Sequence, residues 1–352
     1  MSFPFVQPYA GLSNSLQTAQ ATGGTVGGWV ELGRTTLGGT GDTVSVGSLS
    51  DKRYYMVLGD IIPSGNVYTR TWLNGDTGTN YATRYSGSGA ADATITSTND
   101  TVTNKSTDTT PYFTVQYFSN LPSKEKLWIN HSVEQQTAGA ATAPERMESV
   151  NKWDNTSNAI STIQQTNEAA GDLASGTELV VLGWDPADEH TSNFWEELAS
   201  VDLSGGSADQ ISSGTLSAKK YIWMQLYIEP TGAANINMTF NNDTSTNYAK
   251  RNSNDGGSDG TTTSASSLSM QTTATSAPSF HNLFMINNAS NEKLIIHHAV
   301  AQNTAGASTA PQRKEQAMKW TNTSNQITEI DIDNTDSGSY DTKTILKVWG
   351  SD

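Results

Sequence analysis

Apolar residues in this chain occur in short alternating segments, and glycine, asparagine, aspartate or proline separates one segment from the next. Alternation with a period of two is typical of β-strands, whereas no stretch carries a convincing helical period. Residues 146–153 stay open between a strand and one helical turn, because Pro144 and Glu145 could begin a helix. In the first part of the chain, the other expected strands cover residues 53–58, 67–73, 79–85, 112–118, 125–133, 159–165 and 177–182.

The strand pattern is repeated within the chain. The segment EKLWINH, which begins at Glu125, returns 167 positions later as EKLIIHH at Glu292. Residues 125–162 share 23 identities in 38 aligned positions with the second segment, and no gap is needed. The segment NGDTGTNYATR at residues 74–84 matches NNDTSTNYAKR at the same offset. So long a period indicates duplication of a whole domain rather than a solenoid repeat.

The duplication divides the chain into two similar domains. We assign residues 28–185 to the first β-sandwich repeat, 186–194 to a linker and 195–352 to the second repeat. Each repeat is long enough to build its own core. Residues 1–27 lie outside the repeat and predict an extended N-terminal arm with apolar side chains for docking. The expected fold class is all-β, with two tandem jelly-roll-like sandwiches after the arm; an immunoglobulin-like sandwich stays open.

Composition and charge narrow the function. The chain has no cysteine, so disulfides and thiolate chemistry are excluded. The formal net charge is −15 and the basic residues are scattered, which disfavours nucleic acid and anionic membrane surfaces as partners. No apolar run approaches transmembrane length, and residues 1–11 lack the basic and apolar regions of a signal peptide. We therefore expect a soluble protein.

Ionisable and aromatic residues kept in both repeats are the candidates for chemistry. His131 could form a metal or general-base site with Glu148 and Asp76, but zinc needs three or four ligands, and His297 is matched by an asparagine. We favour a histidine at a strand end that bonds a loop carbonyl or a carboxylate. Paired catalytic carboxylates, a nucleophile elbow and a phosphate loop are lacking, so we expect no catalytic residue, cofactor or metal. The retained pairs are His131/His298, Glu148/Glu315, Arg146/Arg313, Trp153/Trp320, Asp76/Asp243 and Asp185/Asp352.

Three other features have competing interpretations. Residues 74–77 resemble a fragment of a calcium loop, but an Asx turn explains them without an ion. Trp153 is expected in the core, although exposed aromatic rings would keep a carbohydrate-binding role open. Arg146 and Glu148 are expected to form ion pairs with a neighbouring strand. The loop TAGAATAP at residues 137–144 is nearly unchanged in the second repeat, which indicates a packing or contact role.

The repeated motifs W-x-E-L, N-x-D-T-x-T-N-Y, EKLxIxH, TAGAxTAPxRxE and KWxNTSNxI, with a closing G-x-D, resemble a domain of structural proteins in tailed bacteriophages. The resemblance covers nearly everything after residue 27 and transfers no catalytic residue. It implies a virion β-sandwich of the capsid-decoration or head-fibre type. The alternative that it leaves open is a tail-fibre or receptor-binding protein, with a surface glycan as a candidate ligand.

These expectations together describe a non-enzymatic protein on the outer surface of a virion, soluble in the host cytoplasm before assembly. Its expected partners are the major capsid protein or other virion proteins. Two similar domains per chain would let three chains form a pseudo-hexamer, so a homotrimer is expected.

Overall fold

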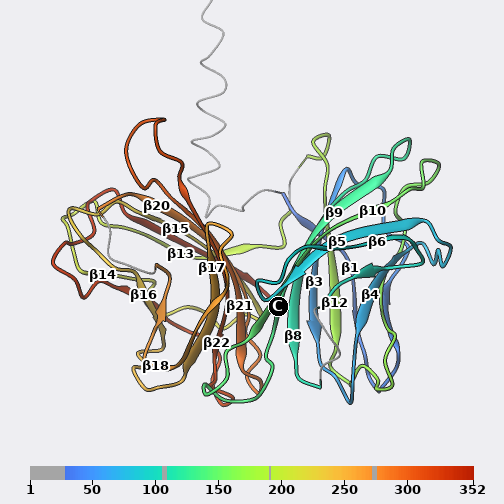
Figure 1. Ribbon diagram of the computed structural model, residues 1–352, viewed down its shortest axis with the longest axis horizontal. Coiled ribbons are helices and arrows are strands. Elements are labelled where there is room, and N and C mark those ends of the chain that lie inside the picture. Colours follow the sequence, from blue (N-terminus) through green and yellow to red (C-terminus); the bar gives the residue numbers. More distant parts are fainter. Residues whose placement is uncertain (1–27, 105–108, 190–191, 272–275) are drawn as a thin grey trace, which may run out of the picture.

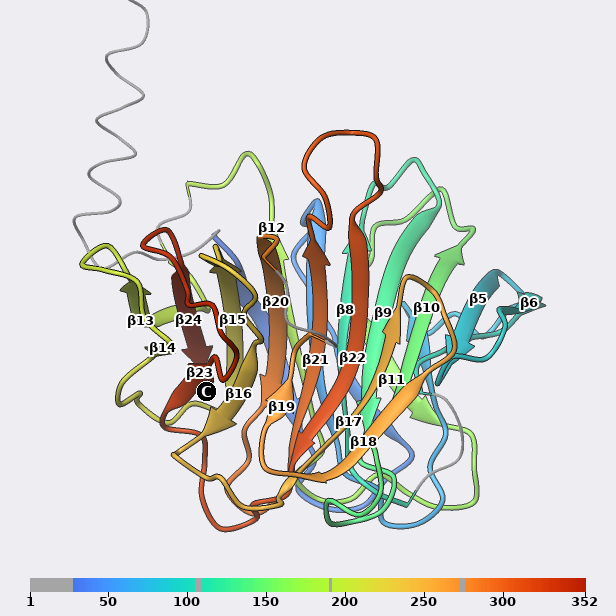
Figure 2. The ribbon, with the colours of Figure 1, turned by 60° about the vertical axis from the view of Figure 1, so that its left-hand side comes forward.

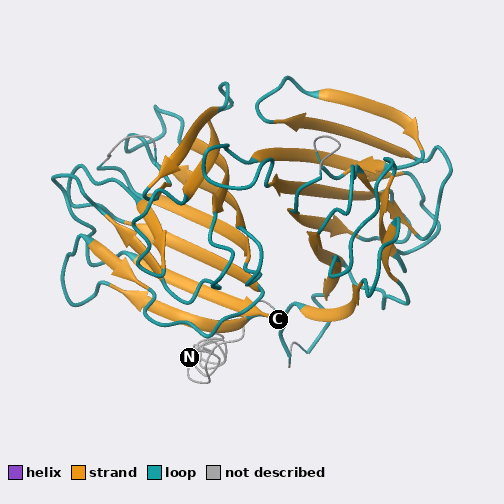
Figure 3. Cartoon of the chain, turned by 90° about the horizontal axis from the view of Figure 1, so that it is seen from below, coloured by secondary structure: helices purple, strands orange, loops and turns teal. Residues whose placement is uncertain are grey.

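The computed structural model describes residues 28–104, 109–189, 192–271 and 276–352, and the expected N-terminal arm lies outside these ranges. All regular elements in the described ranges are β-strands, and Figure 3 shows two groups of strands joined by loops. This confirms the all-β fold class and the two tandem β-sandwiches.

The first repeat consists of an eight-stranded and a four-stranded antiparallel sheet. Their strand orders are β1-β12-β3-β8-β9-β10-β5-β6 and β2-β11-β4-β7, so the chain crosses between the layers several times. The strands of the large sheet are β1 (Val30–Thr36), β3 (Tyr54–Ile61), β5 (Tyr81–Gly87), β6 (Ala93–Thr98), β8 (Tyr112–Ser119), β9 (Lys126–Glu134), β10 (Glu145–Trp153) and β12 (Glu178–Trp184). Those of the small sheet are β2 (Thr43–Val46), β4 (Thr69–Leu73), β7 (Thr101–Val102) and β11 (Ile163–Asn167).

The second repeat has the same architecture, with orders β13-β24-β15-β20-β21-β22-β17-β18 and β14-β23-β16-β19. Its large sheet contains β13 (Glu196–Asp202), β15 (Tyr221–Ile228), β17 (Tyr248–Asn254), β18 (Gly260–Ala265), β20 (Ser279–Ile286), β21 (Lys293–Ala301), β22 (Gln312–Trp320) and β24 (Ile345–Ser351). Its small sheet contains β14 (Gln210–Ser212), β16 (Asn237–Phe240), β19 (Leu268–Ser269) and β23 (Ile330–Asp333).

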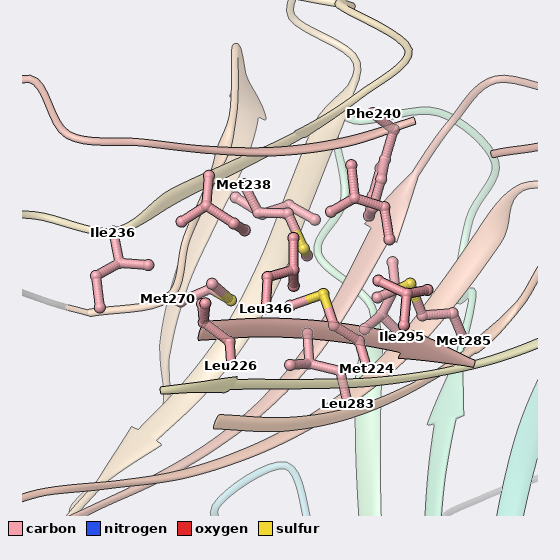
Figure 4. Close-up of a cluster of buried hydrophobic side chains, with 14 of the residues drawn as sticks. Met224, Leu226, Ile236, Met238, Phe240, Met270, Leu283, Met285, Ile295 and Leu346 are labelled. Carbon is pink, nitrogen blue, oxygen red and sulfur yellow. The ribbon is translucent and has the colours of Figure 1, made fainter. Parts of the chain in front are cut away.

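Each repeat packs its own core between the two layers. Alternation decides which side chains enter it: in β4, residues Thr69, Thr71 and Leu73 are buried while the two residues between them are only half-buried. In the second repeat, Met224 of the large sheet and Met238 of the small sheet lie in one cluster of apolar side chains (Figure 4). Burying one such side chain stabilises the fold by roughly 1.5–3 kcal/mol.

A third apolar cluster joins the two repeats. The outer face of β8, β9 and β10 lies against the outer face of β20, β21 and β22, and we call this contact the seam. Figure 1 shows the two sandwiches side by side, with β21 and β22 next to β8 at the middle of the molecule. Side chains from both repeats fill the seam, and Phe113 of β8 packs against Tyr221 of β15 with ring centroids 6.3 Å apart.

The structure settles the open assignment of residues 146–153, which form strand β10 over Glu145–Trp153 and no helical turn. It also adds four strands that the pattern did not predict in the first repeat. Two of these, β2 and β7, are very short, and β6 has the sequence ATITST, whose exposed threonines carry little apolar alternation. The last unpredicted strand, β1, begins within the W-x-E-L motif.

Candidate functional site at the seam between the repeats

The retained aspartate of the N-x-D-T motif organises a turn. Asp76 accepts hydrogen bonds from the Gly78 amide at 2.8 Å, from Asn80 Nδ2 at 2.9 Å and from Trp153 Nε1 at 2.7 Å. Partial burial opposes ionisation, but these hydrogen bonds outweigh it and hold the pKa of the Asp76 carboxyl below its usual value. Asp243 makes the same contacts in the second repeat. The Asx-turn interpretation therefore describes these residues better than a calcium loop does.

Calcium is expected to leave the stability of the protein unchanged. Both carboxylate oxygens of Asp76 already receive hydrogen bonds, so an ion would have to displace donors of the chain itself. A melting temperature measured with calcium and then with a chelator should stay the same. A calcium-dependent rise that Asp76→Asn abolishes would contradict this prediction.

The retained aspartates at the end of each repeat also support the backbone. Asp185 accepts hydrogen bonds from the Arg53 and Ala187 amides at 3.1 and 2.9 Å. Asp352 accepts one from the Lys220 amide at 3.2 Å. Arg53 and Lys220 are equivalent positions, so this carboxylate has the same structural role in both repeats.

The retained histidines meet each other at the seam. His131 lies inside β9, and its ring contacts the ring of His298 of β21, with centroids 4.2 Å apart. The expectation of a histidine at a strand end was therefore wrong. The missing information was the second repeat, which covers the middle of the strand. Burial lowers the pKa of His131 to about 4, so the ring is neutral near pH 7.

Arg146 connects the repeats through a buried group of charges. Its guanidinium contacts Glu148 of its own strand, Asp259 at 2.8 Å and Glu315 at 3.3 Å. Burial opposes the positive charge, but the hydrogen bonds and negative charges of Asp259 and Glu148 outweigh it and raise the pKa of Arg146. The predicted ion pairing of this strand is thus real, but two of the partners come from the other repeat.

The TAGAATAP loop docks on the second repeat. Lys319 Nζ donates hydrogen bonds to the carbonyl oxygens of Gln135 and Thr137 at 3.1 and 2.6 Å, although the lysine side chain is fully buried. Burial lowers the pKa of the Lys319 ammonium, and Glu292 at 3.5 Å opposes that shift. The loop of the first repeat therefore has the contact role that was expected of it.

The seam covers the outer faces of the two repeats unequally. Leu294, Ile296 and Ala317 of the second repeat are at most 5% exposed. Their equivalents in the first repeat are Leu127, Ile129 and Val150, which are 54%, 46% and 52% exposed. These three side chains line a groove of about 720 Å³ on the outer face of the large sheet. Together with Tyr54 we call them the open face.

The structure shows where Trp153 lies and whether the acidic and histidine side chains converge. Trp153 is 1% exposed and belongs to the core, so it is not a sugar-binding platform. Among the residues that the structure describes, no group of three or more histidine, aspartate or glutamate side chains converges as metal ligands would. No helix in the described part of the chain is long and apolar enough to cross a membrane.

Comparisons with known proteins identify no family for this chain. No family model and no curated protein matches the chain. A solved structure described as the LG1-3 region of the laminin alpha2 chain is 8% identical, with a TM-score of 0.21, and the match covers 88% of this chain. The chain spans 64% of the length of that protein. A likeness this weak carries no argument about function.

Proposed function

We propose that this chain is a non-enzymatic virion structural protein, which decorates or stabilises the outer surface of a tailed-phage capsid through protein–protein contacts. The observation that carries this proposal is the use of the residues kept in both repeats. Asp76 and Asp185 organise turns, Trp153 fills a core, and His131 and Arg146 build the seam. A scaffold role explains this set, because each residue supports a turn, a core or the contact between the two β-sandwiches.

Two other features support a role in assembly. The open face presents large apolar side chains on the outer face of the large sheet, which is typical of a protein–protein contact surface. Residues 1–27 supply apolar side chains that could anchor the chain to a capsid lattice. The resemblance of the repeated motifs to phage structural proteins then favours the capsid and other virion proteins as the partners.

Purified protein is expected to co-sediment with empty phage heads that lack it. Binding should saturate, because a lattice offers a fixed number of sites, and it should be lost when residues 1–27 are removed. The truncated chain must keep the thermal unfolding of the full chain for this comparison to hold. Absence of binding to heads, with adsorption to host cells instead, would contradict the capsid role.

The alternative function is a receptor- or carbohydrate-binding protein, and one observation favours it. Tyr54 is 36% exposed and stacks on Trp184 with ring centroids 5.4 Å apart. Exposed aromatic rings of this kind are able to bind a sugar ring. Under this alternative, Tyr54→Ala would abolish binding to glycans or host cells without lowering the melting temperature. Under the capsid proposal, the same variant has no glycan binding to lose.

A further inference from the structure

A small group of residues in the second repeat, which we call the socket, holds the loop of residues 137–144 in the seam. Besides the two bonds from Lys319, the Ser264 amide donates to the Ala140 carbonyl at 2.8 Å. Arg251 Nε donates to the Pro144 carbonyl at 3.0 Å. The Gly139 amide donates to the carboxylate of Glu292. The socket therefore consists of Arg251, Ser264, Glu292 and Lys319, and it holds the loop of residues 137–144.

The first repeat contains the same four residue types at the equivalent positions, and they are exposed. They are Arg84, Ser97, Glu125 and Lys152. Even the backbone agrees, because Ser97 and Ser264 share a left-handed conformation with φ of 52° and 48° at an irregularity in their hairpins. This second socket borders the open face, whose groove Arg84 and Lys152 also line.

The loop that would fit the second socket is exposed too. Residues 304–311, TAGASTAP, differ from the docked loop at one position, and every residue that contacts the socket is the same type. Figure 2 shows this loop between β21 and β22 projecting beyond the end of its sheet. Phe280 and Val300 beside it are 42% and 44% exposed, whereas their equivalents Phe113 and Val133 are buried in the seam.

Buried ion pairs between the two repeats prevent the chain from placing its own residues 304–311 in the second socket. Lys220 bridges Asp60 at 3.0 Å and Glu178 at 3.1 Å across the seam, and both carboxylates are almost fully buried. Bringing residues 304–311 onto the first repeat would pull these buried pairs apart, and breaking such a pair leaves charges without partners. The loop and the socket therefore need separate molecules.

We propose that the second socket binds a second copy of this chain. The loop of residues 304–311, with Phe280 and Val300, docks on the open face and the second socket of a neighbouring chain, and repeats the contact already made inside each chain. Apolar packing on Ile129 and Val150 supplies the contact area, and Lys152 caps the loop carbonyls as Lys319 does. Each chain offers one loop and one socket, so the contact either closes a reciprocal two-fold dimer or continues head-to-tail into a ring or a filament.

Engineered cysteines test this contact directly, because the chain has none of its own. The amide-to-carbonyl distance of 2.8 Å between Ser264 and Ala140 places those residues within reach of a disulfide. The variant Ala140→Cys with Ser264→Cys should form an internal bond and serves as the positive control. Mixed single variants Ser97→Cys and Ala307→Cys should then form a disulfide-linked dimer, which reductant dissolves. A mixture of Ser97→Cys with Thr40→Cys, in the exposed loop between β1 and β2, should not.

Absence of the mixed dimer, while the internal control forms its bond, would overturn the proposal. So would an intrachain bond at the mass of one chain when Ser97→Cys and Ala307→Cys are placed together, because the loop would then reach the socket of its own molecule.

Light scattering gives an independent measurement on the unmodified chain. The mass should rise above that of one chain with increasing concentration, and Val150→Asp should weaken the association by about tenfold or more. Val150 is exposed, so this variant should keep the melting temperature of the parent. A mass of one chain at all concentrations would overturn the proposal. Because no capsid is present in these experiments, their failure would leave the proposed capsid attachment standing.

Discussion

Replacing Trp320 by alanine is expected to destabilise the second repeat by about 3–5 kcal/mol, the range found for large aromatic residues truncated in cores. The side chain is fully buried; its ring stacks on Tyr248 and packs against the tilted ring of Phe240. Its Nε1 donates to Asp243 at 2.8 Å, so truncation also leaves a carboxylate oxygen without this donor. Trp153→Ala should have a similar effect on the first repeat, where the contacts with Tyr81 and Asp76 are equivalent.

Chemical denaturation with tryptophan fluorescence would measure both variants, and Trp320→Phe separates the two contributions. Phenylalanine keeps most of the ring contacts but removes the donor, so it should cost only about 1–3 kcal/mol. A loss near zero for both alanine variants would contradict the burial of these rings. That result would place Trp153 and Trp320 at the surface and favour sugar binding.

The internal repeat and the alternation of apolar and polar residues predicted most of the fold. Strands rich in apolar residues, such as β8 and β9, lay within the expected ranges to within a residue or two. The pattern failed at β6, where ATITST is an exposed strand held by its ladder, and the equivalent strand β18, GTTTSA, is exposed as well. Their threonines have a high strand propensity but no apolar face, so periodicity had nothing to detect.

The seam could be predicted less well, for a physical reason. Lys152 and Lys319 are the same residue type in the same motif, yet one is exposed and the other is fully buried. Identical residues in two copies cannot reveal which copy is covered. A signal did exist where the copies differ: Leu58, Val115 and Val180 of the first repeat are matched by glutamine, asparagine and lysine in the second. That difference marks the part of the first repeat's outer face that the seam buries.

The second repeat also holds a buried chain of hydrogen bonds that the first repeat lacks. Ser279 Oγ lies 2.9 Å from His281 Nε2, His281 Nδ1 lies 3.0 Å from His297 Nε2, and His297 Nδ1 lies 2.7 Å from Gln316 Oε1. One arrangement of neutral rings satisfies every atom: His297 Nδ1 donates to the glutamine oxygen, and His297 Nε2 accepts from His281. With His281 in this tautomer, a further proton on His297 would place two donors against each other. In the first repeat, Thr114 Oγ1 donates to Asn130 Oδ1 instead.

Acid is therefore expected to destabilise the second repeat at a higher pH than protonation of its carboxylates would. Burial, together with Lys314, lowers the pKa of His281 to about 3, and burial together with His281 holds the pKa of His297 well below its usual value. In the unfolded chain both histidines titrate near pH 6.5. The unfolded state gains protons below that value and the folded state does not, so the stability that is fully present above about pH 6.5 is lost as the pH falls. At about pH 4.5 each histidine should cost about 3 kcal/mol.

The first repeat supplies the matched control for this prediction. The double variant His281→Thr with His297→Asn places the threonine–asparagine pair of the first repeat in the second, where the surrounding ladder is the same. Free energies of unfolding measured between about pH 7 and pH 4.5 should fall steeply for the parent and much less for the variant. Titration of carboxylates and of the His131–His298 contact is common to both proteins, so the difference between the two slopes reports the buried pair alone. Equal slopes would mean that this histidine pair is either charged or hydrated in the folded chain, and would contradict the neutral hydrogen-bond chain described above.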